Sequence, residues 1–589
     1  MSLGTALLRR PSRPVLLALL ALLVLVLACG AWVALRAVMA RSHLETAKAQ
    51  TATLEDALRD DDAASAARAL TRVQRETAQA RGLTHDPVWT LVGLVPVLGD
   101  TPDAVSTVAA TVDDLAQTAF PSLVRVSRTL TPQRLRPRGD AFDLAVLAAA
   151  GPDVDRAARQ VATARTTMDG VGGFLPGPVD GAVDDTRAQL RRLSSITSAA
   201  ARAIRLLPPM LGSAGPRAYL VAVQNPAEAR GTGGLLGGYG VVEVQDGRVR
   251  LRESAPNTQL VGAAELPVDL GRDFHELYGD NPALWSNANM SPNFSYAARI
   301  WLALWQRQFG ERLDGVIASD PIALGYLVGA TRPVELADGT SLTAQTTANF
   351  VMRDVYAKHQ LNPARDRTTT LLGRQIIANV LDSDVDPAAL LRAVRRAAGE
   401  GRVLVYSTHA AEQRQLASTR VAGALPRTPG SLAVVVNNGG ANKLDIYLQR
   451  DVRYTLGPCT GDSRPARLEV RLTNRTPSST LPDPATGLPI RGSDGVVLPR
   501  GSNRPLVYVY APNGARLQDA RLDGQPQQMR LGAERGHPVF ATTIELRPGQ
   551  STTLVLRLTG VPRGPIPRID EQPAASDQRS VIAGPECAR

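Results

Sequence analysis

The strongest constraint on the fold is an uncharged apolar run near the N-terminus. Val15 to Leu35 reads VLLALLALLVLVLACGAWVAL, which is 21 residues without a charged side chain. A helix of this length, at about 1.5 Å per residue, crosses a hydrocarbon core of about 30 Å. Three arginines precede the run and favour a cytoplasmic N-terminus. The sequence therefore predicts a cytoplasmic leader at 1–14, a transmembrane helix at 15–35, and the bulk of the chain outside the cytoplasm.

Two alternatives to an uncleaved anchor stay open. A cleaved signal peptide has a shorter apolar core and a small-residue cleavage site, whereas here the apolar run continues past Cys29. VLAC, which ends at Cys29, loosely resembles a lipoprotein box, although Leu27 stands where a small residue is usual. The length of the run favours a single-pass plasma-membrane anchor.

The composition narrows the expected partners. The formal net charge is +11, and all but three of the 66 basic residues are arginine. Ala, Gly, Pro and Arg dominate together, as a GC-rich genome encodes, so part of the basicity is coding bias. Aromatic residues make up only 4% of the chain, and no arginine run is interleaved with aromatics as a base-stacking surface requires. We therefore exclude nucleic acid and expect, besides the lipid bilayer, an anionic partner such as a lipid headgroup or a cell-wall glycan.

Cys459 and Cys587 are the cysteines outside the apolar run. If the bulk of the chain lies outside the cytoplasm, both are in a space that permits oxidation. Because no third cysteine is left over there, we expect a Cys459–Cys587 disulfide. The alternative interpretation is two unpaired small apolar residues.

Hydrophobic periodicity predicts a multidomain α+β fold. Residues 36–206 repeat apolar side chains at three and four positions, which indicates a helical stalk or bundle next to the membrane. Residues 207–428 mix short apolar runs with helical patterns and indicate a central α/β domain. Residues 429–562 consist of short strand patterns between Gly, Pro and Asn turns, which is typical of an immunoglobulin-like β-sandwich. The Pro-rich, polar end at 563–589 predicts a flexible tail.

One hairpin can be predicted in register. VVEVQDGRVRL contains Asp246-Gly247, which suits a two-residue primed turn. That turn pairs Val244 with Val249 and Val242 with Leu251 on one face. It pairs Glu243 with Arg250 on the other face, which is an opposite-charge pair.

The glycine-rich segment NPAEARGTGGLLGGYG, residues 225–240, has two interpretations. Its spacing fits neither G-x-G-x-x-G nor a P-loop, and a hairpin follows instead of a phosphate-binding helix. Consecutive backbone N–H groups beside arginine can bind an anion, which would make a site of Glu228, Arg230, Gly233 and Gly234. Alternatively, the glycines pack closely against the following hairpin. Elsewhere the six histidines are scattered and there is no H-E-x-x-H, C-x-x-C or G-x-S-x-G motif, so we assign no metal, cofactor or catalytic residue.

Longer stretches of the central region carry a family resemblance. QNPAEARGTGGLLGGYGVVEVQDGRVRL, NANMSPNFSYAARIWLALWQRQFGERLDGVIASDPIALGYLVGATRPVEL and DGTSLTAQTTANFVMRDVY resemble the domain-of-unknown-function family DUF4012. The resemblance implies an actinobacterial, single-pass, surface-exposed protein with a helical membrane-proximal part and a β-rich C-terminal part. It implies an association with surface polysaccharide, and it brings no established activity and no catalytic residues.

A second resemblance supplies an alternative function. LDGVIASDPIALGYLVGATRPVEL, DGTSLTA and RDRTTTLLGRQ are similar, in order, to segments of the LytR–CpsA–Psr phosphotransferases. Those enzymes attach polymers from polyprenyl pyrophosphate to the cell wall and use magnesium. The match implies a basic cluster formed by Arg367, Arg374 and Gln375. It also implies that Asp366 is the acid and that Arg230 is the upstream arginine. The alternative for residues 366–375 is a solvated helix start.

The sequence thus predicts a membrane-anchored, extracytoplasmic cell-envelope protein that binds an anionic envelope or polysaccharide component. The alternatives are a phosphotransferase acting on a polyprenyl-pyrophosphate-linked glycan, and a structural or adhesive surface module.

Overall fold

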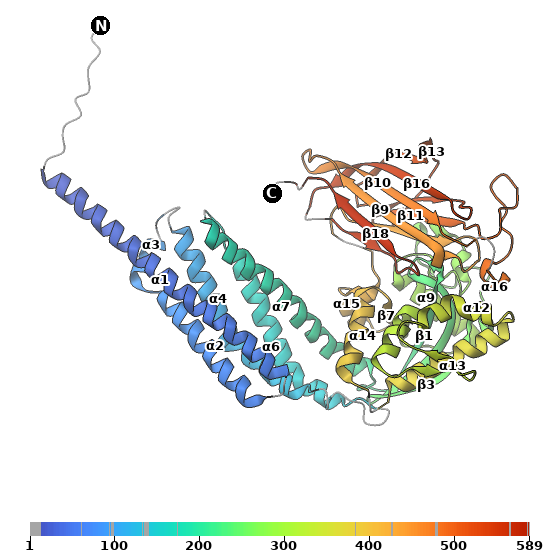
Figure 1. Cartoon of the computed structure of the whole chain (residues 1–589), viewed down its shortest axis with the longest axis horizontal. Coiled ribbons are helices and arrows are strands. Elements are labelled where there is room, and N and C mark those ends of the chain that lie inside the picture. The colour runs from blue at the N-terminus through green and yellow to red at the C-terminus, as the bar shows by residue number, and fades with distance from the viewer. Residues whose placement is uncertain are drawn as a thin grey trace, which may run out of the picture. The chain divides into compact units, whose positions relative to one another are not determined.

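The computed structural model describes residues 13–59, 62–93, 95, 99–131, 134, 141–173, 175–382, 385–425, 428–477, 481–564, 567–585 and 587. The expected leader at 1–14 therefore lies almost wholly outside the described residues. The chain divides into two compact units (Figure 1). The first combines residues 1–135 with 144–208, and the second combines 136–143 with 209–589.

The first unit is helical, as the periodicity predicts. Its described helices are α1 (Arg13–Arg59), α2 (Ala63–Leu83), α3 (Pro87–Gly93), α4 (Asp100–Thr129), α6 (Leu144–Asp169) and α7 (Gly177–Met210). The Asp62 side chain accepts hydrogen bonds from the N–H groups of Ala64 and Ser65, and so caps the start of α2.

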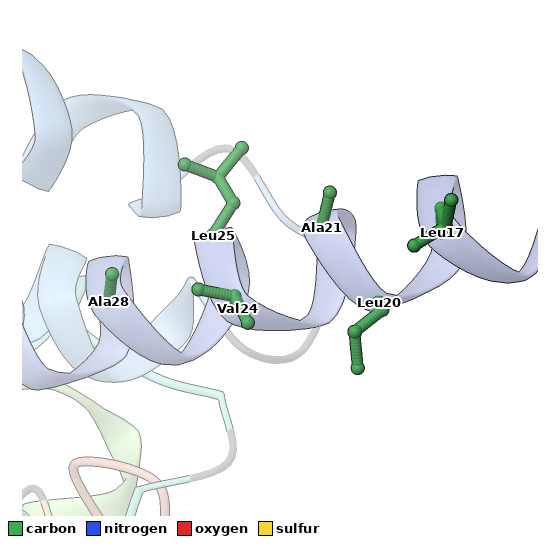
Figure 2. Close-up of a pocket in the computed structure, with 6 residues that line it drawn as sticks. All are labelled: Leu17, Leu20, Ala21, Val24, Leu25 and Ala28. Atoms are coloured by element: carbon green, nitrogen blue, oxygen red, sulfur yellow. The ribbon is translucent and has the colours of Figure 1, made fainter.

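The apolar run forms the first half of the single 47-residue helix α1. Leu20, Val24 and Leu27 are 58–63% exposed, which is unusual for side chains of this kind. Figure 2 shows six of these apolar side chains, from Leu17 to Ala28, projecting from the helix. Among the described residues this is the one helix long and apolar enough to cross a membrane, and it is either an anchor or a signal sequence.

The second half of α1 packs into the bundle. Ala40, Ala47 and Leu54 are buried at seven-residue intervals. This heptad spacing is typical of α-helices that pack in a left-handed supercoil. Leu54 packs with Ala66 and Ala69 of α2 in one cluster of buried side chains. The small alanine side chains allow the two helices to approach closely. A single unbroken helix therefore passes from the apolar run into the helical unit.

The second unit contains a mixed five-stranded sheet with strand order β3-β2-β1-β4-β7. Its strands are β1 (Arg217–Arg230), β2 (Gly233–Gln245), β3 (Arg248–Pro256), β4 (Gly315–Ser319) and β7 (Val403–Ser407). β1 pairs with β4 in parallel, and the remaining pairs are antiparallel. The main helices of this region are α8 (Arg272–Tyr278), α9 (Phe294–Phe309), α10 (Pro321–Ala330), α13 (Asn362–Val380), α14 (Pro387–Gly399) and α15 (Ala410–Leu416).

A short excursion separates α10 from α13. It consists of the strand pair β5 (Val334–Glu335) and β6 (Ser341–Leu342), then α11 (Thr347–Asn349), a π-helical turn (Phe350–Asp354) and α12 (Val355–Lys358).

The predicted hairpin is confirmed in register. β2 and β3 pair Val242 with Leu251, Glu243 with Arg250, and Val244 with Val249. Asp246 and Gly247 both have positive φ, at 49° and 81°, as a primed turn requires. The Glu243 and Arg250 side chains form the expected ion pair.

The C-terminal strands form two further sheets. One has the order β13-β12-β16-β10-β9-β18, and the other has the order β14-β15-β11-β8-β17. The strands are β8 (Leu432–Asn438), β9 (Leu448–Leu456), β10 (Ser463–Asn474), β11 (Pro505–Tyr510), β12 (Arg516–Leu522), β13 (Gln525–Pro526), β14 (Arg530–Glu534), β15 (His537–Thr543), β16 (Ser551–Pro562), β17 (Ile569–Glu571) and β18 (Gln578–Ala583), with the helical turn α16 (Asp483–Thr486) after β10.

Strand β8 shows how the layers of the second unit stack. Leu432 and Val434 point into a core shared by the two C-terminal sheets. Ala433 and Val435, which alternate with them, pack with Trp301 of α9 in the core of the central domain. Both faces of β8 are therefore buried, which explains its continuous apolar sequence. The two C-terminal sheets therefore pack on each other around one core. That they form an immunoglobulin-like sandwich stays a prediction.

The prediction of a flexible tail at 563–589 is wrong for its described residues. β17 pairs in parallel with β8, and β18 pairs in parallel with β9, so the tail adds an edge strand to each sheet. The predicted disulfide between Cys459 and Cys587 is confirmed, with the two Cα atoms 5.9 Å apart. Composition misleads here because the edges of β8 and β9 offer unpaired backbone groups that a polar strand can satisfy.

Candidate functional site

The glycine-rich segment is a closely packed turn and strand. β1 ends at Arg230, and β2 begins at Gly233. A Cβ atom at Gly234 would overlap the main chain of Asn225, and one at Gly231 would overlap the main chain of Ser291. Gly233 has a φ of 137°, which L side chains rarely adopt. These contacts favour the packing interpretation of the glycines.

Arg230 is buried, and each guanidinium nitrogen has a partner. Its Nε donates to the carbonyl of Ser286 at 3.0 Å. Its Nη1 donates to the carbonyls of Ala229 and Asn438 at 2.8 and 3.2 Å. Its Nη2 donates to Glu228 Oε1 and Asn287 Oδ1, both at 3.1 Å. The guanidinium has no donor left over for an external anion in this arrangement.

The second oxygen of Glu228 accepts from Lys443, which follows β8. Glu228 therefore lies between two cations, and its side chain is only 5% exposed. Burial by itself raises the pKa of Glu228, but the charges of Lys443 and Arg230 outweigh it and hold that pKa below its ordinary value. The charged form of Glu228 thus joins the end of β1 to the C-terminal sheets.

Two more side chains extend this junction, which we call the Glu228 junction. Asp445 accepts from the N–H of Ala229 at 2.7 Å, and from the amides of Asn438 and Asn503 at 2.8 Å. From the C-terminal end of the chain, Gln572 bridges the backbone of β8 and also donates to the Arg230 carbonyl. Four separate segments of sequence meet around the end of β1.

Sequence analysis did not find the partners of Glu228 and Arg230. Lys443 carries one weak signal, because it is one of only three lysines in the chain. Asp445 and Gln572 carry none, because nothing in their local sequence links them to β1.

Among the described residues, no hydrogen bond or ion pair joins the four residues proposed on α13 to the Glu228 junction. Arg367 and Arg374 are exposed on the helix surface. Arg374 donates to the Ser254 carbonyl of β3, at 3.4 Å. Asp366 accepts from the Thr258 hydroxyl at 3.1 Å, and the exposed Gln375 donates to Asn379 within its own helix. Arg230 is buried and fully bonded, so it has no donor left for a site shared with these arginines.

A buried carboxyl, Glu534 of β14, was not expected. Its Oε1 accepts from the Ser291 hydroxyl at 2.6 Å, and its Oε2 accepts from the Tyr278 and Tyr510 hydroxyls at 3.0 and 3.4 Å. No lysine or arginine forms an ion pair with it among the described residues. Burial, opposed only in part by the three hydroxyls, raises the pKa of Glu534 to about 7.

The described residues contain no group of three or more His, Cys, Asp or Glu side chains that could hold a metal ion. The contacts of Glu228 are with Arg230 and Lys443, and those of Glu534 are with the hydroxyls of Ser291, Tyr278 and Tyr510. Their geometry supports a structural role between the central domain and the C-terminal sheets.

The comparisons with known proteins place the chain by its central region. The chain carries a DUF4012 domain at residues 214–356, which match the model of a family described as a protein of unknown function. No curated protein matches the chain.

Solved structures that are similar to parts of the chain include the M1 zinc metallopeptidase from Deinococcus radiodurans and a mutant of it. Each is 18% identical, covers 20% of this chain and 21% of its own, and has a TM-score of 0.12. The chain thus spans about a fifth of their length, and the likeness carries no argument about its fold or activity.

The Glu228 junction generates a stability prediction. Replacing Arg230 by Met leaves Glu228 and several carbonyls with lost partners in a buried setting, and should lower the free energy of unfolding by about 3–5 kcal/mol. Urea unfolding followed by tryptophan fluorescence measures it, because Trp285, Trp301 and Trp305 are buried in this unit. The matched control is Arg367→Met, an exposed arginine, with an expected change within about 0.5 kcal/mol. Equal losses for the two variants would contradict the assignment.

Glu534 generates a pH prediction. Its pKa of about 7 in the folded protein lies above the ordinary value of 4.5. The stabilisation that protonated Glu534 gives to the folded state is therefore fully present below pH 4.5. It is lost as the pH rises to 7, because the unfolded chain gives up the proton at a lower pH than the folded protein does. Between pH 4.5 and pH 7 the wild type should therefore lose roughly 3 kcal/mol of unfolding free energy relative to Glu534→Gln, which does not titrate. A difference that stays constant with pH would disprove the assignment.

Proposed function

We propose that the chain is a single-pass, membrane-anchored protein of the cell envelope, with its bulk outside the cytoplasm. The continuity of α1 supports an uncleaved anchor, because one helix contains both the exposed apolar run and the buried positions Ala40 and Ala47. The disulfide between Cys459 and Cys587 is consistent with an oxidising compartment. We also propose the immunoglobulin-like class for the paired C-terminal sheets.

The proposed activity is binding of an anionic envelope polymer by α13. The observation that carries it is the pair Arg367 and Arg374, which are exposed and have no carboxylate partner among the described residues. Seven residues are nearly two helical turns, so both side chains point the same way, about 10 Å apart along the axis. Leu371 lies between them and is 53% exposed.

This spacing favours a ligand with repeated charges. Two guanidinium groups about 10 Å apart do not grip one phosphate together, but each can pair with a separate anionic group along a polymer. An anionic wall glycan has this character. The buried Arg230 supplies no third donor, so nothing favours the alternative of pyrophosphate chemistry at this surface.

The location is tested with an amine-reactive reagent that does not cross membranes. On intact spheroplasts it should modify Lys48 and Lys358, which lie beyond the apolar run and are accessible, whereas the half-buried Lys443 should react less because it is paired with Glu228. Peptide mass spectrometry reads the sites, and a cytoplasmic protein is the control for leakage. Modification of Lys358 only after lysis would contradict the proposed topology. An intact mass that lacks the residues before Leu35 would replace the anchor by a signal peptide.

Binding is tested with a double variant, Arg367→Gln with Arg374→Gln. Affinity for a purified anionic wall polymer should fall by about tenfold or more, and the dependence on salt should weaken, because two charge-assisted contacts are lost. The matched control is Arg516→Gln with Arg579→Gln, which removes two exposed arginines that also lack an ion-pair partner among the described residues. An equal loss in both double variants would mean that only net charge matters, and would refute the α13 site.

A further inference from the structure

The helical unit contains a polar cleft that the proposed function does not use. Its volume is about 340 Å³, which lies at the lower end of the range of small-molecule sites. The cleft is lined mainly by residues of α4 and α6, and His85, which follows α2 in sequence, also lines it. Ala110, Leu115 and Ala164 contribute apolar surface to it. We call it the α4–α6 cleft.

The hydroxyl groups of the cleft are not used by the protein. Thr107, Thr111, Thr163 and Thr167 line it, and no hydrogen bond of their hydroxyls is found among the described residues. Other threonines of the same helices behave differently: Thr118 and Thr166 donate to the carbonyl four residues earlier, at 2.5 and 3.1 Å. That back-bonding is the usual way for a helical threonine to satisfy its hydroxyl.

Two more polar side chains add to this set. Gln160 has no hydrogen-bond partner among the described residues, and Ser106 reaches only the His85 ring, at 3.3 Å. Thr111 is a buried residue, but its hydroxyl is not among the fully buried polar atoms that lack a partner. The hydroxyl therefore remains accessible from the cleft that Thr111 lines. The cleft thus presents several groups that can each donate and accept a hydrogen bond.

The charges of the cleft exclude one class of ligand. Its described lining residues include Asp103 and Asp114 but no lysine or arginine. Asp114 is paired with Arg81 at 2.6 Å, and Asp103 has no ion pair among the described residues. A phosphate, sulfate or carboxylate would meet carboxylates here without a compensating cation, so the site disfavours anions.

We propose that the α4–α6 cleft binds a neutral sugar, as a single ring or a disaccharide. A sugar ring carries a dense set of hydroxyls that donate and accept, and this matches the unpaired threonines and Gln160. The Asp103 carboxylate adds an acceptor for ligand hydroxyls. Among the described residues the lining contains no Phe, Tyr or Trp, so a large stacking surface does not contribute and we expect a dissociation constant on the order of 1 mM. The inference is independent of the arginines on α13, which lie in the other unit.

The test uses the full chain in phosphocholine micelles, because alkyl-glycoside detergents carry a competing sugar. Saturation-transfer NMR is recorded with a panel of neutral monosaccharides and disaccharides and with a sugar phosphate. We expect saturable transfer to at least one neutral sugar and a much weaker signal from the sugar phosphate. The double variant Thr107→Val with Thr163→Val should weaken binding by about tenfold, because two hydroxyl contacts are lost.

The matched control is Thr118→Val with Thr166→Val, which removes two back-bonded hydroxyls from the same two helices. It should leave sugar binding unchanged. If the first double variant unfolds, as judged by its thermal transition, Gln160→Leu serves in its place. Absence of saturable transfer from the whole panel, preference for the sugar phosphate, or equal weakening in test and control variants would each overturn the proposal.

Discussion

The second unit depends on a buried carboxylate. Glu228 lies between Arg230 and Lys443 at the point where the end of β1 meets the C-terminal sheets. Buried charges are tolerated only when their partners are in place together, because each unpaired one has a large desolvation cost. β1, the segment after β8, and the C-terminal tail must therefore reach their positions as a set. The DUF4012 match ends at residue 356, but the groups that neutralise Arg230 and Glu228 come from both inside and outside it.

This arrangement explains why the central domain and the paired sheets form one compact unit. β8 buries apolar side chains on both faces, one toward the central helices and one toward the second sheet. Glu534 adds a second contact, where a carboxyl with a pKa near neutrality accepts from hydroxyls of the central domain. The interface thus combines a fixed ion cluster with one group whose charge responds to pH.

In the helical unit, the main feature is a change from exposed to buried side chains along α1. In α1 the side chains from Leu19 to Leu35 are largely exposed, while from Ala40 onward one face is buried against neighbouring helices. The change of environment occurs within one helix, so no loop separates the apolar run from the bundle. The two candidate surfaces also differ in chemistry. α13 offers guanidinium groups that have no carboxylate partner among the described residues, whereas the α4–α6 cleft offers a carboxylate and threonine hydroxyls that form no hydrogen bond in the described part of the chain. The two proposed ligands differ accordingly, because one is anionic and the other is neutral.

The sequence by itself determined the features that depend on local patterns. The apolar run, the helical region and the hairpin at Asp246-Gly247 follow from periodicity and turn chemistry, which act over a few residues. The disulfide followed from compartment and count. Only the tertiary structure decided the fate of Arg230, because its partners Ser286, Asn438 and the neighbours of Glu228 lie far apart in sequence. The same reason applies to the tail, whose polar strands gain order from the edges of β8 and β9, and to Glu534, whose burial is created by a distant domain.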